Sequence, residues 1–228
     1  MHEVLDLFSG IGGFSLGLER AGMRTVAFCE IEPFARRVLR KHWPEVPIHD
    51  DIRKLTGDRI APNVICGGYP CQPFSTASRG RRIATDLWPE MLRLIDRCSP
   101  AYVIVENVQE AAISNAASDL RVLGYRTYQR RISAADCGAD HQRNRWWLVA
   151  YPDSKSELHR ALDAEVAKLP EICRDLWGAA NYAGAVRVSS RLSRRMDRSR
   201  IEALGNAVLP QITEAIGMAI LAAEMANA

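Results

Sequence analysis

The residues best suited to catalytic chemistry lie in the stretch Val64–Ser75, whose sequence is VICGGYPCQPFS. Its thiol, Cys71, is flanked by Pro70 and Pro73, which fix the backbone φ and prevent a strand from continuing. The apolar run Val64–Cys66 before it ends in two glycines, a pattern typical of a buried strand that stops at a sheet edge. We therefore expect Cys71 on a stiff loop at the carboxyl end of a central strand, where ligands bind in open α/β sheets. A small buried cysteine in a turn is the alternative.

Acidic side chains follow three other predicted strands. Glu30 ends the run Arg24–Cys29, a position where a carboxylate commonly binds two ribose hydroxyls. The alternative is an exposed glutamate that caps the next helix. Asp51 follows the short extended run Val46–His49 and is placed to bind an adenine amino group. Glu106 ends a strongly apolar run, and a partly buried carboxylate there would have a raised pKa and relay a proton; an exposed strand-end glutamate is the alternative.

The chain begins with a strand, a glycine turn and a helix. Glu3–Phe8 has the composition of a strand, Ser9–Gly13 contains three glycines, and Phe14–Ala21 has helical apolar spacing. This order is typical of the opening of a nucleotide-binding unit. Glycines let the backbone approach a ligand, and the amino end of a helix favours a carboxylate or phosphate. A glycine turn by itself also fits a dinucleotide site or an ordinary tight turn.

Arginines form two groups beyond these strands, although the formal net charge is only +3. One group follows Cys71 and the other lies between residues 187 and 200. The planar guanidinium suits phosphate, so both groups indicate nucleic acid; a solvated charged face is the alternative. Arg143 and Arg145 alternate on an extended segment, so both should point to one face.

Composition limits the class of protein. The 228 residues suffice for one good domain and a small appendage, and 47% of them are hydrophobic. We expect no apolar run long enough to span a membrane and no secretory signal, and hence a cytoplasmic protein. The six cysteines contain no CxxC pair, so we assign no metal ligand and expect reduced thiols.

The periodicity predicts an α/β fold with a mainly parallel sheet. Periodicity is poor between residues 152 and 200, which are expected to form a small inserted region. Further strands are expected at 101–105, Tyr125–Ser133 and Trp146–Tyr151, and helices at Pro33–His42, Leu87–Cys98, Glu110–Leu123, Glu157–Leu169 and Gln211–Met225.

Taken together, these residues resemble the DNA cytosine-5 methyltransferase family, whose motifs occur in the same order along this chain. The matching blocks are DLFSGIGGF (6–14), Glu30, Asp51-Ile52, GGYPCQPFS (67–75), ENV (106–108), QRNR (142–145) and GNAVLP (205–210). The resemblance implies a Rossmann-like class I methyltransferase fold, with helices flanking the sheet and a small irregular region. It also implies a catalytic domain at 1–151, a short recognition region at 152–200, and a closing motif at 201–228 with a helix that returns to the catalytic domain. A bacterial or phage-encoded protein is expected on the same ground.

The resemblance also implies the ligands. The family takes a methyl group from S-adenosylmethionine, leaves S-adenosylhomocysteine, and acts on double-stranded DNA, often in restriction-modification. The positions of this chain that match cofactor-contacting positions are Phe8, Ser9, Gly10, Gly12, Gly13, Glu30, Ile31, Asp51, Ile52, Pro70, Leu87, Asn206 and Val208.

The chemistry follows from the same resemblance. Cys71 adds to C6 of a flipped-out cytosine, because C5 alone is a poor nucleophile, and C5 then takes the methyl group. Glu106 bonds the N3 and N4 edge of the ring, while Arg143 and Arg145 stabilise the flipped nucleotide and its developing charge. A base then removes the C5 proton and Cys71 is expelled. The positions assigned to nucleic-acid contact are Gln72, Ser75, Arg79, Arg81, Arg82, Arg191, Arg194 and Arg195.

Two features depart from the family pattern. His141 stands where a glutamine usually precedes the paired arginines. The segment 152–200 is short for a recognition domain and too small to bury its own core, so a specificity partner or an oligomer is expected. The alternatives are an RNA (transfer RNA) cytosine-5 methyltransferase on the same fold, a non-catalytic nucleic-acid-binding relative, and a different Rossmann-type enzyme that uses a dinucleotide.

Overall fold

The computed structural model describes residues 1–58, 60–70, 86–138, 142–155, 157–173 and 203–226. Within these residues the strands form one seven-stranded sheet of order β3-β2-β1-β4-β5-β7-β6. The first five strands in that order run parallel, and β7 is antiparallel to both neighbours. The expected Rossmann-like fold with a mainly parallel sheet is therefore confirmed. The strands are β1 Glu3–Leu7, β2 Arg24–Cys29, β3 Ile48–His49, β4 Val64–Gly67, β5 Tyr102–Asn107, β6 Arg126–Ile132 and β7 Arg145–Tyr151.

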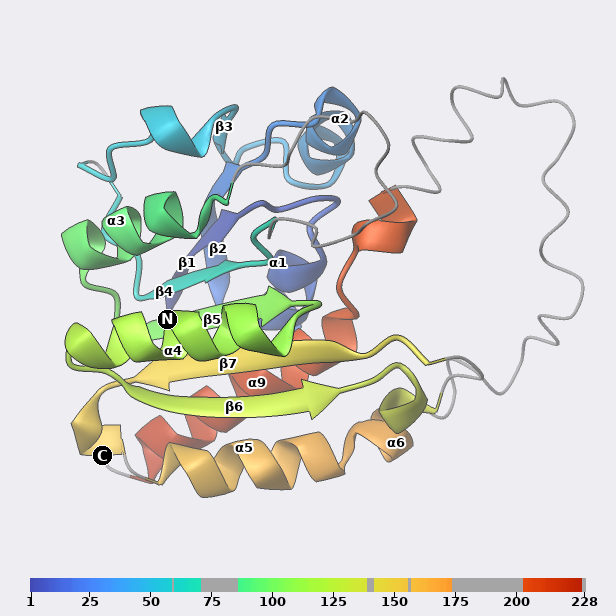
Figure 1. Cartoon of the computed structure of the whole chain (residues 1–228). Helices are drawn as coiled ribbons and strands as arrows, with labels where there is room; N and C mark the ends of the chain where they lie inside the picture. Colours follow the sequence, from blue (N-terminus) through green and yellow to red (C-terminus); the bar gives the residue numbers. More distant parts are fainter. Residues whose placement is uncertain (59, 71–85, 139–141, 156, 174–202, 227–228) are drawn as a thin grey trace, which may run out of the picture.

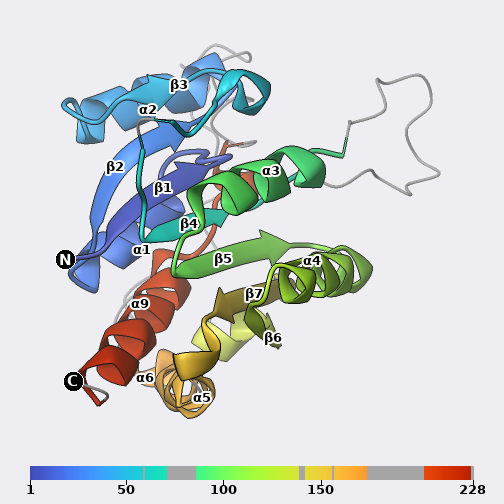
Figure 2. The same cartoon turned by 90° about the vertical axis from the view of Figure 1, so that its left-hand side faces the viewer.

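Helices cover both faces of this sheet (Figures 1 and 2). Side chains of the central strands alternate between two core clusters, as the pleat requires. One cluster holds α3 (Trp88–Cys98) and α4 (Glu110–Val122) against one face. The other holds α1 (Gly13–Arg20), α5 (Leu158–Ala167), α6 (Leu169–Ile172) and α9 (Pro210–Met225) against the opposite face. The remaining elements are α2 (Pro33–His42) and the 3-10 turns η1 (Ile52–Lys54), η2 (Ala135–Cys137) and η3 (Asp153–Lys155).

The predicted elements are present, with ends that differ by two residues at most. The helix expected over Glu157–Leu169 is divided, because α5 ends at Ala167 and α6 begins at Leu169. Pro170 explains the division, since proline is tolerated in the first turn of a helix but not in its interior.

Part of the segment assigned to target recognition belongs to the main core. Leu158, Leu162 and Leu169 of α5 and α6 are fully buried in the same cluster as α9. The division at residues 151 and 200 stays a prediction, because residues 174–202 lie outside the described residues.

One described segment differs from the expectation about membranes. Ala203–Met225 is long and apolar enough to cross a bilayer by length and composition, and 44% of its most apolar stretch is buried. In this fold α9 packs against α1 and α5, with Ile216 and Ile220 inside the core. The apolar composition of α9 is therefore explained by its position as a core helix.

The contact between α1 and α9 requires glycine. A Cβ atom on Gly17 would overlap the Thr213 hydroxyl and the Pro210 carbonyl, and one on Gly217 would lie 2.7 Å from the Ala21 Cβ. The Thr213 hydroxyl donates to the Pro210 carbonyl at 2.9 Å. The two helix backbones therefore approach more closely than any larger residue at position 17 permits.

We predict that Gly17→Ala lowers the free energy of unfolding by about 2–3 kcal/mol, because the added methyl group overpacks this contact. Urea denaturation measures the change. Gly205→Ala is the matched control, since a Cβ there would meet nothing within 4 Å, and its effect should stay within about 0.5 kcal/mol. Equal effects of the two substitutions would contradict the requirement for close packing at Gly17.

Candidate active site

A cavity of about 760 Å³ opens at the carboxyl ends of β1, β2, β4 and β5. β7 is antiparallel, so its first residue lies at this same edge. The cavity gathers most of the residues predicted to hold the cofactor, together with two predicted catalytic residues. Its lining includes Phe8, Gly10, Glu30, Ile31, Asp51, Ile52, Pro70, Leu87, Glu106, Arg145 and Asn206.

The glycine turn between β1 and α1 presents backbone to this cavity. Phe8 and Gly10 both have φ of 54°, and Gly12 has φ of 87°. The Gly12 amide donates to the Ser9 carbonyl at 2.8 Å, which closes the turn. A Cβ on Gly10 would meet nothing within 4 Å, so its backbone is open to a ligand. The Ser9 side chain is buried and its hydroxyl donates to the Asp6 carbonyl at 2.6 Å, a contact within the turn rather than with the cavity.

Glu30 links the end of β2 to the glycine turn. Its carboxylate accepts the Gly10 amide at 2.6 Å and the Glu32 amide at 2.7 Å, and its residue is only 7% exposed. Burial raises the pKa of Glu30. Because each carboxylate oxygen has two acceptor sites, both oxygens keep capacity for hydroxyl donors from the cavity.

Asp51 and Ile52 form the wall beside β3. The Asp51 carboxylate accepts the Arg53 amide at 3.0 Å and the Arg53 Nε at 2.9 Å. These Arg53 hydrogen bonds lower the pKa of Asp51 to about 2. Ile52 is buried in the core cluster that contains α3 and α4, whereas Ile31 is 58% exposed at the rim.

A second cavity of about 350 Å³ lies beside the first. It is lined by Gly12, Gly13, Val208 and Arg143, four predicted site residues that do not line the larger cavity. A Cβ on Gly13 would lie 2.8 Å from both the Val208 carbonyl oxygen and its Cγ2 atom. The closing motif is therefore packed directly against the glycine turn. The cofactor assignment of Gly12, Gly13 and Val208 stays a prediction.

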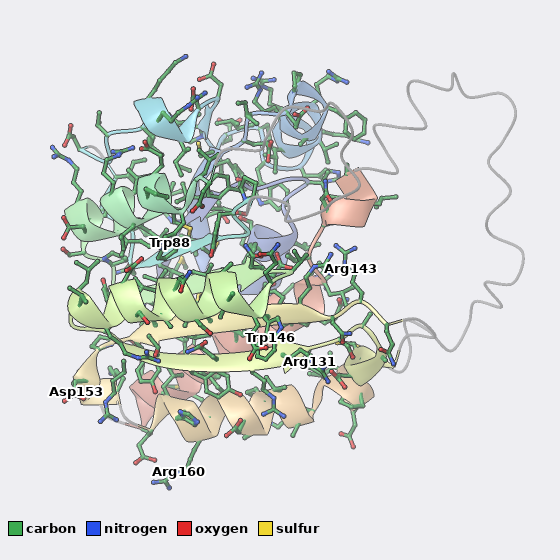
Figure 3. All side chains as sticks on the ribbon, viewed as in Figure 1. Trp88, Arg131, Arg143, Trp146, Asp153 and Arg160 are labelled. Atoms are coloured by element: carbon green, nitrogen blue, oxygen red, sulfur yellow. The ribbon has the colours of Figure 1, made fainter. Side chains whose placement is uncertain are left out.

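Glu106 and two arginines form the charged part of the site. The Arg145 Nε atom lies 2.7 Å from Glu106 Oε1, and Arg143 extends toward residues 203–207 and donates to the Ala207 carbonyl at 2.9 Å (Figure 3). Burial raises the pKa of Glu106 to about 7, although Arg145 and Arg143 both lower it. A Cβ on Gly68 would lie 2.8 Å from Glu106 Oε2. This glycine therefore lets the carboxylate lie against the end of β4, which leads to the predicted nucleophile.

Asn107 links β5 to the segment that precedes the predicted nucleophile. Its Nδ2 donates to the Tyr69 carbonyl at 3.0 Å, and its Oδ1 accepts the Gln109 amide at 3.0 Å. The Tyr69 hydroxyl donates to the Ala112 carbonyl at 2.8 Å, and its ring lies 5.2 Å from that of Trp88. The sequence places Asn107 in the ENV block, but the motif alone indicates no role for it. Its position directly after Glu106 is the sequence feature that could indicate a role.

Several predicted residues lie outside the described residues, and their assignments stay predictions. They are Cys71, Gln72, Ser75, Arg79, Arg81, Arg82, His141, Arg191, Arg194 and Arg195.

Comparison with known proteins places this geometry in context. The family model described as C-5 cytosine-specific DNA methylase matches residues 2–196. The chain is 32% identical over 202 residues to the Type II methyltransferase M.NgoMIV of Neisseria gonorrhoeae, covering 79% of this chain and 62% of that protein. It is 34% identical over 162 residues to the Type II methyltransferase M2.BsuMI of Bacillus subtilis (strain 168), covering 65% and 41%. The chain thus spans about half the length of the curated relatives it matches.

Solved structures share the fold at low sequence identity. A candidate DNA modification methyltransferase encoded within an E. coli prophage aligns with a TM-score of 0.67 at 18% identity, covering 99% of this chain and 100% of that chain. A mutant of DNMT2 from Spodoptera frugiperda aligns with a TM-score of 0.59 at 23% identity, covering 68% and 51%.

The raised pKa of Glu106 predicts a pH dependence of stability. A folded-state pKa near 7 against an unfolded value of 4.5 means that this group contributes stability below pH 4.5 and loses it as the pH rises to about 7. Glu106→Gln is uncharged at every pH. Relative to wild type, this variant should gain up to about 3 kcal/mol of unfolding free energy across that range.

Urea denaturation at several pH values between 4 and 8 measures the difference. Glu110→Gln, at an exposed position at the start of α4, is the matched control and should show a far smaller slope. A difference between wild type and Glu106→Gln that stays constant with pH would contradict the raised pKa.

Proposed function

Because the chain belongs to the C-5 cytosine-specific DNA methylase family, we propose that it transfers a methyl group from S-adenosylmethionine to C5 of cytosine in double-stranded DNA. The observation that carries this proposal is the buried Glu106, paired with Arg145 in the same cavity as Gly10 and Glu30. Glu106, which can hold a proton, and the residues suited to binding a nucleoside therefore line the same cavity. The match to a family of DNA methylases favours DNA over RNA as the substrate.

The cavity fits the cofactor. Its volume of about 760 Å³ lies in the range of small-molecule sites, and the open Gly10 backbone and the Glu30 carboxylate line it. We assign Glu30 to the ribose hydroxyls, Asp51 to the adenine amino group, and Phe8 and Ile52 to the two sides of the adenine ring. When bound, S-adenosylmethionine supplies the methyl group.

The chain's own residues act on the cytosine ring. The Cys71 thiolate forms a bond from sulfur to C6, and electrons of the C5–C6 double bond move into the ring. Glu106, whose pKa of about 7 keeps it partly protonated near neutral pH, donates a hydrogen bond to N3 and so stabilises the charge that develops there. C5 would then form a bond to the methyl group that the bound cofactor supplies. After C5 has lost its proton to a base, the sulfur–C6 bond breaks, the C5–C6 double bond forms again and the thiolate of Cys71 is released.

The arginines position the nucleotide and the acid. Arg145 holds Glu106 through its ion pair, and Arg143 and Arg145 together provide cationic groups for the flipped nucleotide. The target base must leave the duplex to reach this pocket. We assign Gln72, Ser75, Arg79, Arg81 and Arg82 to contacts with the surrounding DNA.

The predicted recognition region, residues 152–200, is short for a domain that reads a target sequence. Base-edge readout needs several placed side chains, and α5 and α6 of that region are already committed to the core. Arg191, Arg194 and Arg195 would bind phosphate, which contributes affinity without sequence preference. We therefore propose that a partner chain or a second copy contributes to target choice.

Methyl transfer tests the proposed function directly. Pure protein incubated with methyl-labelled S-adenosylmethionine and mixed duplex DNA should place the label in 5-methylcytosine, and Cys71→Ala should reduce it by at least about a thousandfold, because removing a nucleophile costs several orders of magnitude. Cys98→Ala is the matched control: this thiol is half-buried on α3, away from the cavity lining, and the variant should keep wild-type activity.

Other outcomes would contradict parts of the proposal. Equal labelling by Cys71→Ala would remove the assigned nucleophile. Labelling of transfer RNA in place of DNA would overturn the substrate. Absence of cofactor binding by wild type would overturn the proposed activity as a whole.

A further inference from the structure

Trp43 fills the space beneath the glycine turn. It closes α2, where its amide donates to the Leu39 carbonyl at 2.8 Å. A Cβ on Gly12 would lie 2.6 and 2.7 Å from the Cζ3 and Cη2 atoms of the Trp43 ring. The indole therefore contacts the turn at Gly12, whose φ of 87° lies in the left-handed region.

Two elements that carry the site hold this indole in place. Its Nε1 donates to both Glu19 carboxylate oxygens, at 3.0 and 2.8 Å. Its ring packs edge-on against Phe28 of β2, with centroids 5.3 Å apart. Glu19 also accepts the Thr25 amide at 3.4 Å. Trp43 therefore contacts α1 on one side and, on the other, β2, the strand that precedes Glu30.

The same helix forms part of the cavity wall. Phe34 and Ala35, in the first turn of α2, line the larger cavity. Trp43 at the other end of α2 therefore joins this wall to the glycine turn, which supplies the facing backbone at Gly10. A displacement of the indole would change the spacing between the two sides of the cavity.

We propose that Trp43, held by Glu19, is a positioning residue that sets the backbone path of the turn Ser9–Gly13 for binding of the S-adenosyl cofactor. This inference rests on the proposed function. Trp43 does not line either cavity, so it acts through Gly12 and α2 and not by touching the ligand. A purely structural tryptophan would lower stability when truncated but leave the affinity of the folded protein unchanged.

Cofactor affinity separates these two roles. Calorimetric titration of the folded full chain with S-adenosylhomocysteine should show about tenfold weaker binding by Trp43→Ala, within the usual range for coupling between neighbouring sites. Trp43→Phe keeps a ring under Gly12 and should stay within about threefold of wild type. Trp146→Ala is the matched control: this half-buried tryptophan packs on the α4 side of β7, away from α2 (Figure 3), and its affinity should equal that of wild type.

A double substitution tests whether the effect passes through Gly12. Gly12→Ala should weaken binding strongly in wild type, since the new methyl group meets the indole. In the Trp43→Ala background the same change should weaken binding less, because the obstructing ring is gone; the backbone strain at Gly12 remains in both. Additive effects of the two substitutions would contradict coupling between these residues.

Each outcome decides a different claim. If wild type binds the cofactor and folded Trp43→Ala binds it equally well, Trp43 is not a positioning residue, while the proposed function stands. If wild type does not bind the cofactor, the proposed function fails and this inference with it. Should Trp43→Ala not fold, Glu19→Gln decides: it weakens the hold on the indole, and about threefold weaker binding with a nearly unchanged thermal midpoint is expected, whereas unchanged affinity would overturn the inference.

Discussion

The close contact between α1 and α9 is the constraint on which the site depends. The Thr213 hydroxyl lies 3.3 Å from the Gly13 carbonyl, a contact between residues 200 positions apart in the chain. It holds the segment before α9 so that Val208 packs on Gly13 and Asn206 lines the main cavity. With any larger side chain at Gly17 the helices would separate, and the closing motif would leave the turn that it helps to shape.

The carboxyl edge of the sheet concentrates buried carboxylates. Asp6, Glu30 and Glu106 are all less than 10% exposed, and burial raises the pKa of each. The pKa of Asp6 reaches about 7 even though Ser15 donates to it from its amide and its hydroxyl. Desolvation therefore outweighs local hydrogen bonding at this edge. The raised pKa values lower the stability of the folded protein near neutral pH. They also allow a buried carboxyl group to keep its proton there, as the proposed chemistry requires.

Aromatic side chains anchor the two segments that border the site, the one around residues 69–88 and the glycine turn Ser9–Gly13. Tyr69 precedes the segment of the predicted nucleophile, and Trp88 follows that segment. The two rings pack together, and Trp88 Nε1 donates to Asp119 of α4 at 2.8 Å. Trp43 packs in a similar way beneath the glycine turn and donates to Glu19 of α1. In each case the aromatic ring packs against one element, and its N–H or O–H group donates a hydrogen bond to another. One side chain can thus both fill space and link two elements.

Sequence alone determined the element order, the strand ends at which Glu30, Asp51 and Glu106 lie, and the family, because apolar periodicity and short motifs are local properties of the chain. Tertiary structure decided the rest. It placed Arg145 against Glu106, raised the pKa of that acid by burial, put Val208 and Gly13 in a second cavity, and committed α5 and α6 to the core. It also showed the contacts of Asn107, Gly17 and Trp43. These depend on distances between residues far apart in the chain, which no local pattern records.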